Sequence, residues 1–169
     1  MDKDCRSCEF NFNGICCGSS DLYHYGEVIT DETKCCTGWG ASFQYFEHQT
    51  TTAPRFLRDA HTECRISYQE FSKLVDDYDA GKAVPINIFD ALKAVYGISM
   101  VDIAIVLGVT FGVVYRAKTQ GFAKKRLAQF ANGLCLPERL LLSTTTEDFD
   151  ELSKCKKAFF CKAGYGYSS

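Results

Sequence analysis

Six of the ten cysteines fall within the first 36 residues, and this density constrains folding more than any other feature of the chain. They form a Cys5-x2-Cys8 motif and two adjacent pairs, Cys16-Cys17 and Cys35-Cys36. Five glycines interrupt the first 40 residues. So short and interrupted a segment cannot bury enough apolar surface to offset the entropy lost on ordering. It therefore needs cross-links, either covalent bonds or a bound metal.

The start of the chain favours metal over disulfides. Residues 1–8 are polar and lack the apolar stretch of a secretory signal, so we expect a reducing, cytoplasmic location. A C-x2-C turn presents two sulfurs to one tetrahedral ion, and two further thiolates complete a structural zinc site. The sequence therefore predicts bound Zn2+, with disulfides and an iron–sulfur cluster as the alternatives.

The adjacent pairs leave a choice of ligands. Neighbouring side chains in an extended segment point to opposite sides, so only one cysteine of each pair should reach the metal. The Cys5-x2-Cys8, Asn13-Gly14-x-Cys16 and Cys36-x2-Trp39-Gly40 elements resemble small cysteine modules of Gram-positive bacteria and their mobile elements. The resemblance implies four zinc ligands, namely Cys5, Cys8, Cys16 and Cys36. The residues that could replace one of them are Cys17, Cys35, His24 and His48, since three-cysteine, one-histidine sites are also common.

Nothing in the sequence indicates catalysis. A hydrolytic zinc site needs an open coordination position and a nearby carboxylate base, as in H-E-x-x-H, and this motif does not occur. The sequence also shows no nucleophile–base pair, phosphate loop or paired carboxylates. We therefore expect a non-enzymatic protein without a small-molecule substrate. Four aromatic residues follow the last cysteine pair. They are expected to form an apolar lid on the module or, alternatively, a surface on which bases stack: Trp39, Phe43, Tyr45 and Phe46.

Length and charge suggest a small module attached to one larger domain. A chain of 169 residues can hold one hydrophobic core and a small satellite. The polar stretch 49–54 predicts a linker between a zinc module over 1–48 and a helical domain over 55–160, followed by a flexible tail at 161–169. Residues 1–50 carry eight acidic and three basic side chains, whereas the remainder is basic. No apolar run approaches the ~20 residues that span a bilayer, so no membrane partner is expected.

Helix signals crowd the middle of the chain. Ser67 begins a capping box with Glu70, and helices are predicted from Asn87 to Gly97 and from Ser99 to Gly108. The next helix is expected after Thr110. Short helices joined by a glycine-containing turn are typical of a helix-turn-helix. Residues 87–141 resemble the repressor-like helix-turn-helix family of phage regulators. The expected fold is mainly α, with a small irregular or β zinc module followed by a helical domain of helix-turn-helix type.

The second helix of this motif lacks the side chains of a DNA reader. Its first residues are Phe111, Gly112 and Val113, where base-reading proteins usually carry Arg, Asn, Gln or Ser. DNA contact is still possible through phosphate-binding cations, and a solvated helical face is the alternative reading. The candidate contacts are Arg116, Lys118, Lys124, Lys125 and Arg126.

Two binding functions remain open. In size, cysteine module and helix-turn-helix core the chain is similar to type II anti-CRISPR metalloproteins, a likeness of architecture without a shared motif. It implies a host Cas9-type guide-RNA nuclease as the protein partner, which an acidic module could bind on a basic surface. The candidate acidic contacts are Asp21, Glu27, Asp31 and Glu32. The alternative is a DNA-binding transcriptional regulator. The remaining thiols are expected to be buried or idle: Cys64, Cys135, Cys155 and Cys161.

Overall fold

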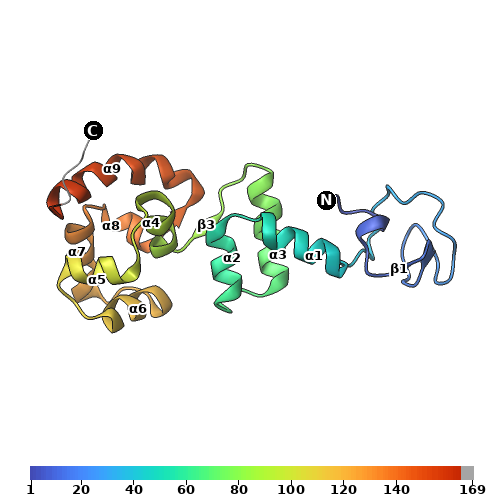
Figure 1. The fold of residues 1–169 in the computed structure, drawn as a ribbon, viewed down its shortest axis with the longest axis horizontal. Helices are drawn as coiled ribbons and strands as arrows, with labels where there is room; N and C mark the ends of the chain where they lie inside the picture. Colours follow the sequence, from blue (N-terminus) through green and yellow to red (C-terminus); the bar gives the residue numbers. More distant parts are fainter. Residues whose placement is uncertain (165–169) are drawn as a thin grey trace. The chain divides into compact units, whose positions relative to one another are not determined.

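The computed structural model describes residues 1–164, and the chain separates into two compact units, Met1–Pro54 and Arg55–Ser169. The protein is mainly helical, with a small two-stranded region near the N-terminus (Figure 1). Within residues 1–164 no single helix is long and apolar enough to cross a membrane. Only two helices taken together reach that length and composition, Met100–Leu107 and Phe111–Gln120, and they are bent by 118° at the break between them.

The first unit is built on short elements. It contains the 3-10 turn η1 (Cys5–Ser7), the antiparallel strands β1 (Asn11–Phe12) and β2 (Ile15–Cys16), and the helix α1 (Phe43–Thr52). Asn13 and Gly14 join the strands with φ of 51° and 80°, the left-handed pair that a two-residue hairpin turn needs. Val28 pairs with Ile15 on the other side of β2, so a third extended segment completes a small sheet.

Helix α1 continues to Thr52 and so includes most of the stretch 49–54, which was predicted to be a linker. The linker prediction and the end of the module at residue 48 were therefore wrong. Ser42 caps the helix by accepting the Tyr45 N–H at 3.2 Å. The hydroxyls of its last three threonines donate to carbonyls one turn back, to Phe46, Glu47 and His48. These bonds satisfy the three hydroxyls within the helix, at an end made of residues with low intrinsic helix propensity. The division between the units lies after Pro54, which agrees with the predicted start of the helical domain at residue 55.

The second unit holds most of the helices. They are α2 (Arg55–Thr62), α3 (Tyr68–Asp79), α4 (Ile88–Tyr96), α5 (Met100–Leu107), α6 (Phe111–Gln120), α7 (Lys124–Leu134), α8 (Glu138–Leu142) and α9 (Phe149–Lys162), with the turn η2 (Thr146–Asp148). Strand β3 (Pro85–Ile86) pairs antiparallel with β4 (Thr144–Thr145), which ties the start of α4 to the segment after α8. Fully buried side chains from α3, α4, α5, α7 and α9 form the core: Phe71, Leu92, Ile103, Phe130 and Phe159.

The predicted caps are confirmed where the sequence signal was local. Asn87 caps α4 through its side chain, and Gly97 ends that helix in the left-handed region. Ser99 and Asp102 form a complete capping box on α5, which ends at left-handed Gly108. At Ser67 only one half of the predicted box is made, the bond from the Glu70 N–H to the serine hydroxyl.

The last helix extends beyond the predicted start of the tail. Helix α9 continues to Lys162 because Phe159 is buried against Tyr96 and Lys162 donates to the Asn132 carbonyl. The tail prediction is therefore wrong for residues 161 and 162, and its last part, 165–169, lies outside the described residues.

A buried ion cluster ties α4 and α6 to the turn between α2 and α3. Lys118 Nζ lies 2.9 Å from one Asp90 oxygen, and Arg65 Nη2 forms an ion pair with the other at 2.8 Å. Glu63 accepts from Lys118 at 3.2 Å. The Asp90 and Lys118 side chains are only 4% and 7% exposed. Lys118 was predicted to contact a nucleic acid, and this is corrected here because its ammonium group is buried and paired.

We expect Asp90→Ala to lower the free energy of unfolding by about 3 kcal/mol, because it leaves the buried Lys118 ammonium group with only the exposed Glu63 carboxylate as counter-charge. Urea denaturation followed by circular dichroism measures the change. Asp79→Ala on the exposed surface of α3 is the matched control and should shift stability by no more than about 0.5 kcal/mol. Equal losses in the two variants would contradict a stabilising role for the cluster.

Candidate metal centre

The four predicted zinc ligands surround one cavity in the first unit. Cys5, Cys8 and Cys16 are buried, Cys36 is half-buried, and all four line a space of about 10 Å³. This is about the volume that one water-sized sphere occupies. The neighbouring cysteines of the two pairs, Cys17 and Cys35, are exposed and do not line it. The alternation of side chains therefore separates each pair into one inward and one outward thiol.

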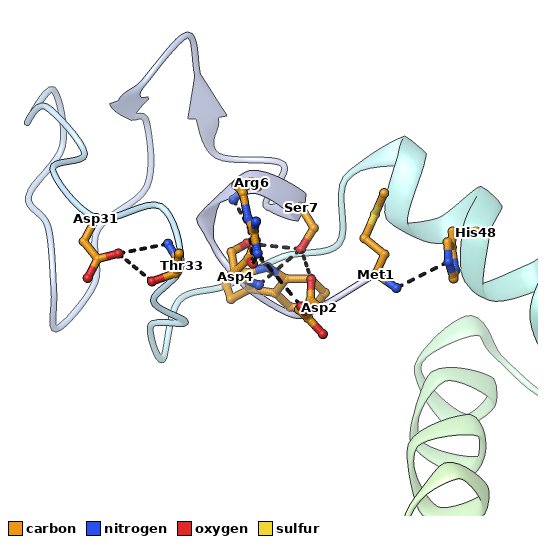
Figure 2. Close-up of polar contacts among 9 residues, drawn as sticks. Met1, Asp2, Asp4, Arg6, Ser7, Asp31, Thr33 and His48 are labelled. Atoms are coloured by element: carbon orange, nitrogen blue, oxygen red, sulfur yellow. Dashed lines mark hydrogen bonds and ion pairs between the residues drawn. The ribbon is translucent and has the colours of Figure 1, made fainter.

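The turn η1 sets the positions of Cys5 and Cys8. Asp4 caps the turn by accepting the Arg6 N–H at 2.9 Å, while its own N–H donates to the Ser7 hydroxyl at 3.2 Å (Figure 2). The Arg6 side chain also donates to Asp4, and this bond holds the pKa of the buried Asp4 carboxyl below its usual value. The Cys8 N–H then donates to the Cys5 carbonyl at 3.4 Å, which brings both thiols to the same side of the turn.

The hairpin sets the position of Cys16. Asn11 and Cys16 are cross-strand partners, and both line the cavity, so they share the inner face of the sheet. The Cys16 N–H donates to the Glu27 carbonyl at 2.9 Å, which fixes β2 between its two neighbours. Cys17 follows on the opposite side, as strand geometry requires.

The loop that carries Cys36 is tied back to η1. The Cys5 N–H donates to the Lys34 carbonyl at 3.0 Å, and the Trp39 ring N–H donates to the Asp4 carbonyl at 2.9 Å. Trp39 packs edge-on against Tyr45 with ring centroids 4.9 Å apart. The predicted aromatic lid is therefore formed only in part, since Phe43 is 77% exposed.

The donor type suits a soft metal ion such as Zn2+, whereas the placement of the four thiols does not by itself form a metal site. Burial raises the pKa of the Cys5 thiol, and the negative charges of Cys36, Cys8 and Cys16 raise it further. Four thiolates brought onto one Zn2+ ion would form the usual structural zinc site. Across residues 1–164 no three His, Cys, Asp or Glu side chains lie close enough together to hold a metal ion as the structure stands. The four thiols share only the lining of this cavity.

The other candidate ligands lie away from this cavity. His24 and His48 are exposed and do not line it. The four cysteines of the second unit were expected to be buried or idle, and none is buried: Cys64 and Cys161 are exposed, whereas Cys135 and Cys155 are half-buried. None of the ten cysteines, all within the described part of the chain, forms a disulfide.

Three of the four predicted acidic contacts also close turns within the module. Each accepts a backbone N–H: Asp21 from Thr37 at 2.8 Å, Asp31 from Thr33 at 3.1 Å, and Glu27 from His24 at 2.8 Å. Glu32 is exposed. Of these four, Glu32 is therefore the best position for a charge test, because a change there breaks none of these turn bonds.

The predicted cations of the second unit, apart from Lys118, lie on its surface. Arg116 and Arg126 line a cavity of about 310 Å³ between α6 and α7, together with Phe122. Lys124 and Lys125 are exposed in the first turn of α7, which contains no acidic side chain. The structure thus brings Arg116 and Arg126 to one cavity. Lys124 and Lys125 directly precede Arg126 in the sequence but do not line this cavity.

Sequence reasoning missed the residues that hold the site in shape. Tyr23 and Ile29 form a buried cluster with Cys5 and Cys16, and Asp4 and Ser7 cap the turn between the first two ligands. The Asp4-x-x-Ser7 spacing around the C-x2-C motif was a readable signal for this cap. Comparison with known protein families, curated proteins and solved structures finds no match to the chain.

We expect about one zinc per chain in protein purified without added metal, as measured by elemental analysis. Cys16→Ser should release the metal and loosen the first unit, because three thiolates bind zinc less tightly than four. Cys17→Ser is the matched control and should retain it. Retention of zinc in Cys16→Ser together with its loss in Cys17→Ser would reverse the choice of ligand.

Proposed function

We propose that this chain is a non-enzymatic, zinc-binding protein of a phage or mobile element that inhibits a host guide-RNA nuclease of the Cas9 type by binding to it. The metal shapes the first unit, and the second unit contributes a helix-turn-helix used for protein contact. The nature of the partner rests on the likeness in architecture to anti-CRISPR proteins. The preference for protein over DNA rests on the surface of α5 and α6.

The exposed side chains of α5 and α6 are the observation that carries this preference. The two helices meet at 118°, close to the upper end of the range for helix-turn-helix motifs. Val101 and Ile105 are exposed one turn apart on α5, as are Phe111 and Tyr115 on α6. The Phe111 and Tyr115 rings stack with centroids 6.2 Å apart. Apolar side chains cannot read the hydrogen-bonding edges of bases, but they suit a protein interface.

The charge of the first unit supports the same choice. It carries eight acidic and three basic side chains, and a four-thiolate zinc site would add two further negative charges. Such a module is repelled by phosphate backbones and attracted by the Lys- and Arg-lined channel of a guide-RNA nuclease. Complementarity of this kind needs no base-reading residues.

A DNA-binding transcriptional regulator is the second candidate. Arg116 and Arg126 at one cavity, with Lys124 and Lys125 at the start of α7, offer a group of cations for phosphate oxygens. Such contacts position a protein on DNA without reading its sequence. The regulator reading therefore predicts binding that falls steeply with salt and depends on these cations.

A DNA-cleavage assay with a purified Cas9-type nuclease distinguishes the two candidates. The wild-type protein should inhibit cleavage, and Ile105→Ser/Tyr115→Ser should weaken inhibition by removing apolar contact area. Lys124→Glu/Arg126→Glu is the comparison and should leave inhibition intact. Absence of inhibition of several such nucleases, together with nanomolar binding to a selected DNA site that the charge-reversal variant loses, would favour the regulator instead.

Charge reversal at Glu32 tests the electrostatic part of the proposal. Glu32→Lys should slow association with the nuclease at low ionic strength, and the difference should shrink at 1 M salt, where the screening length is about 3 Å. Surface plasmon resonance measures both rates. Glu47→Lys on exposed α1 makes the same change of charge at another place in the unit. Equal slowing by both variants would indicate a general effect of net charge and no local contact at Glu32.

A further inference from the structure

The small sheet of the first unit has two faces of opposite character. On the inner face, Asn11 and Cys16 line the cysteine cavity. On the outer face, Phe12 pairs with Ile15, and Ile15 pairs with Val28 on the third segment. Because cross-strand partners project from the same side of a sheet, these three side chains form a row across it. We call Phe12, Ile15 and Val28 the outer row.

The outer row is exposed in the described part of the chain. Phe12 is 68% exposed, Val28 63% and Ile15 40%. Three large apolar side chains in contact with water contribute little to the stability of the unit, because stabilisation scales with the apolar area removed from water. A contiguous exposed patch of this kind is typical of a surface that another molecule covers.

The charges of the segment that carries the outer row limit what can cover it. Residues 9–33 contain five acidic side chains and no lysine or arginine; Glu27 is next to Val28 in sequence, and Asp31 is paired with Lys34 at 3.6 Å. A second copy that docked through the same face would bring two such acidic segments together, and a nucleic acid would add its phosphates to them. A partner that supplies lysine and arginine around an apolar side chain matches both the charge and the row.

The backbone of this surface is held in place before any partner arrives. The Asn13–Gly14 turn fixes the register of β1 and β2, and the Ile29 N–H donates to the Gly14 carbonyl at 2.7 Å. On the inner face, the buried cluster of Cys5, Cys16, Tyr23 and Ile29 supports the sheet. A preformed surface loses less conformational entropy on binding, which favours its use in recognition.

We propose that the outer row is a docking surface for a basic segment of a protein partner, with one apolar side chain of the partner seated on the row and its lysines and arginines paired with carboxylates of residues 9–33, Glu27 first among them. Identifying that partner as a nuclease rests on the function proposed above. The chemistry of the segment is inferred from the outer row and the charges of residues 9–33 alone.

Peptide display against the full-length, zinc-loaded protein tests the surface without assuming the partner. Selected peptides should combine lysine or arginine with an aromatic or aliphatic side chain. Their affinity should fall at least about tenfold for Phe12→Ala, the loss typical of a central interface residue. Phe43→Ala removes an exposed phenylalanine from α1, 77% exposed against 68% for Phe12, and should have no effect. Peptides without basic residues, or equal affinity for both variants, would overturn the proposal.

The same variants, measured against a purified Cas9-type nuclease, separate this inference from the proposed function. Zinc content and thermal unfolding establish that each variant is folded, and Val28→Thr provides a second change that preserves strand propensity. Binding by wild type that Phe12→Ala and Val28→Thr both weaken supports the docking surface. Unchanged binding by both variants overturns it and leaves the proposed function standing. If the nuclease binds neither wild type nor any variant, the proposed partner is overturned. If the selected basic peptides still require Phe12, the docking surface is supported independently of that partner.

Discussion

The first unit depends on what surrounds one small cavity, because it has little else to hold it together. Its buried cluster consists of Cys5, Cys16, Tyr23 and Ile29, and two of these four side chains are thiols. The turn η1, the hairpin and the loop before Trp39 each bring cysteine to the same place. A metal bond at this point would join three segments that hydrophobic burial alone stabilises weakly.

The second unit is stabilised by different forces and can serve as a scaffold. Its helices enclose fully buried Phe71, Phe130 and Phe159, and the ion pairs of Asp90 fix α6 against α4. This stability permits α5 and α6 to leave apolar side chains on the surface. The protein thus combines a helical body with an acidic, cysteine-rich module, and both present exposed apolar groups. This combination fits binding to a protein better than reading of DNA.

Features that depend on neighbouring residues, such as helix caps, can be predicted from the sequence. Features that depend on contacts between distant residues cannot. The caps at Asn87 and Ser99 are local bonds, and the inward and outward cysteines follow from strand alternation. Lys118 was misjudged because Asp90, 28 residues away, buries and pairs it. The helical state of residues 49–52 was missed because their low helix propensity was taken to indicate a linker, whereas they continue a helix that Ser42 caps. That four cysteines line one cavity likewise needed the three-dimensional structure.

The central claim is that four thiolates of the first unit share one zinc ion, and X-ray absorption at the zinc edge tests it most directly. The account predicts that protein purified without added metal shows four sulfur neighbours at about 2.3 Å from zinc. A shell that includes nitrogen at about 2.0 Å would place a histidine in the site and contradict the ligand set. Folded protein without zinc would contradict the claim itself.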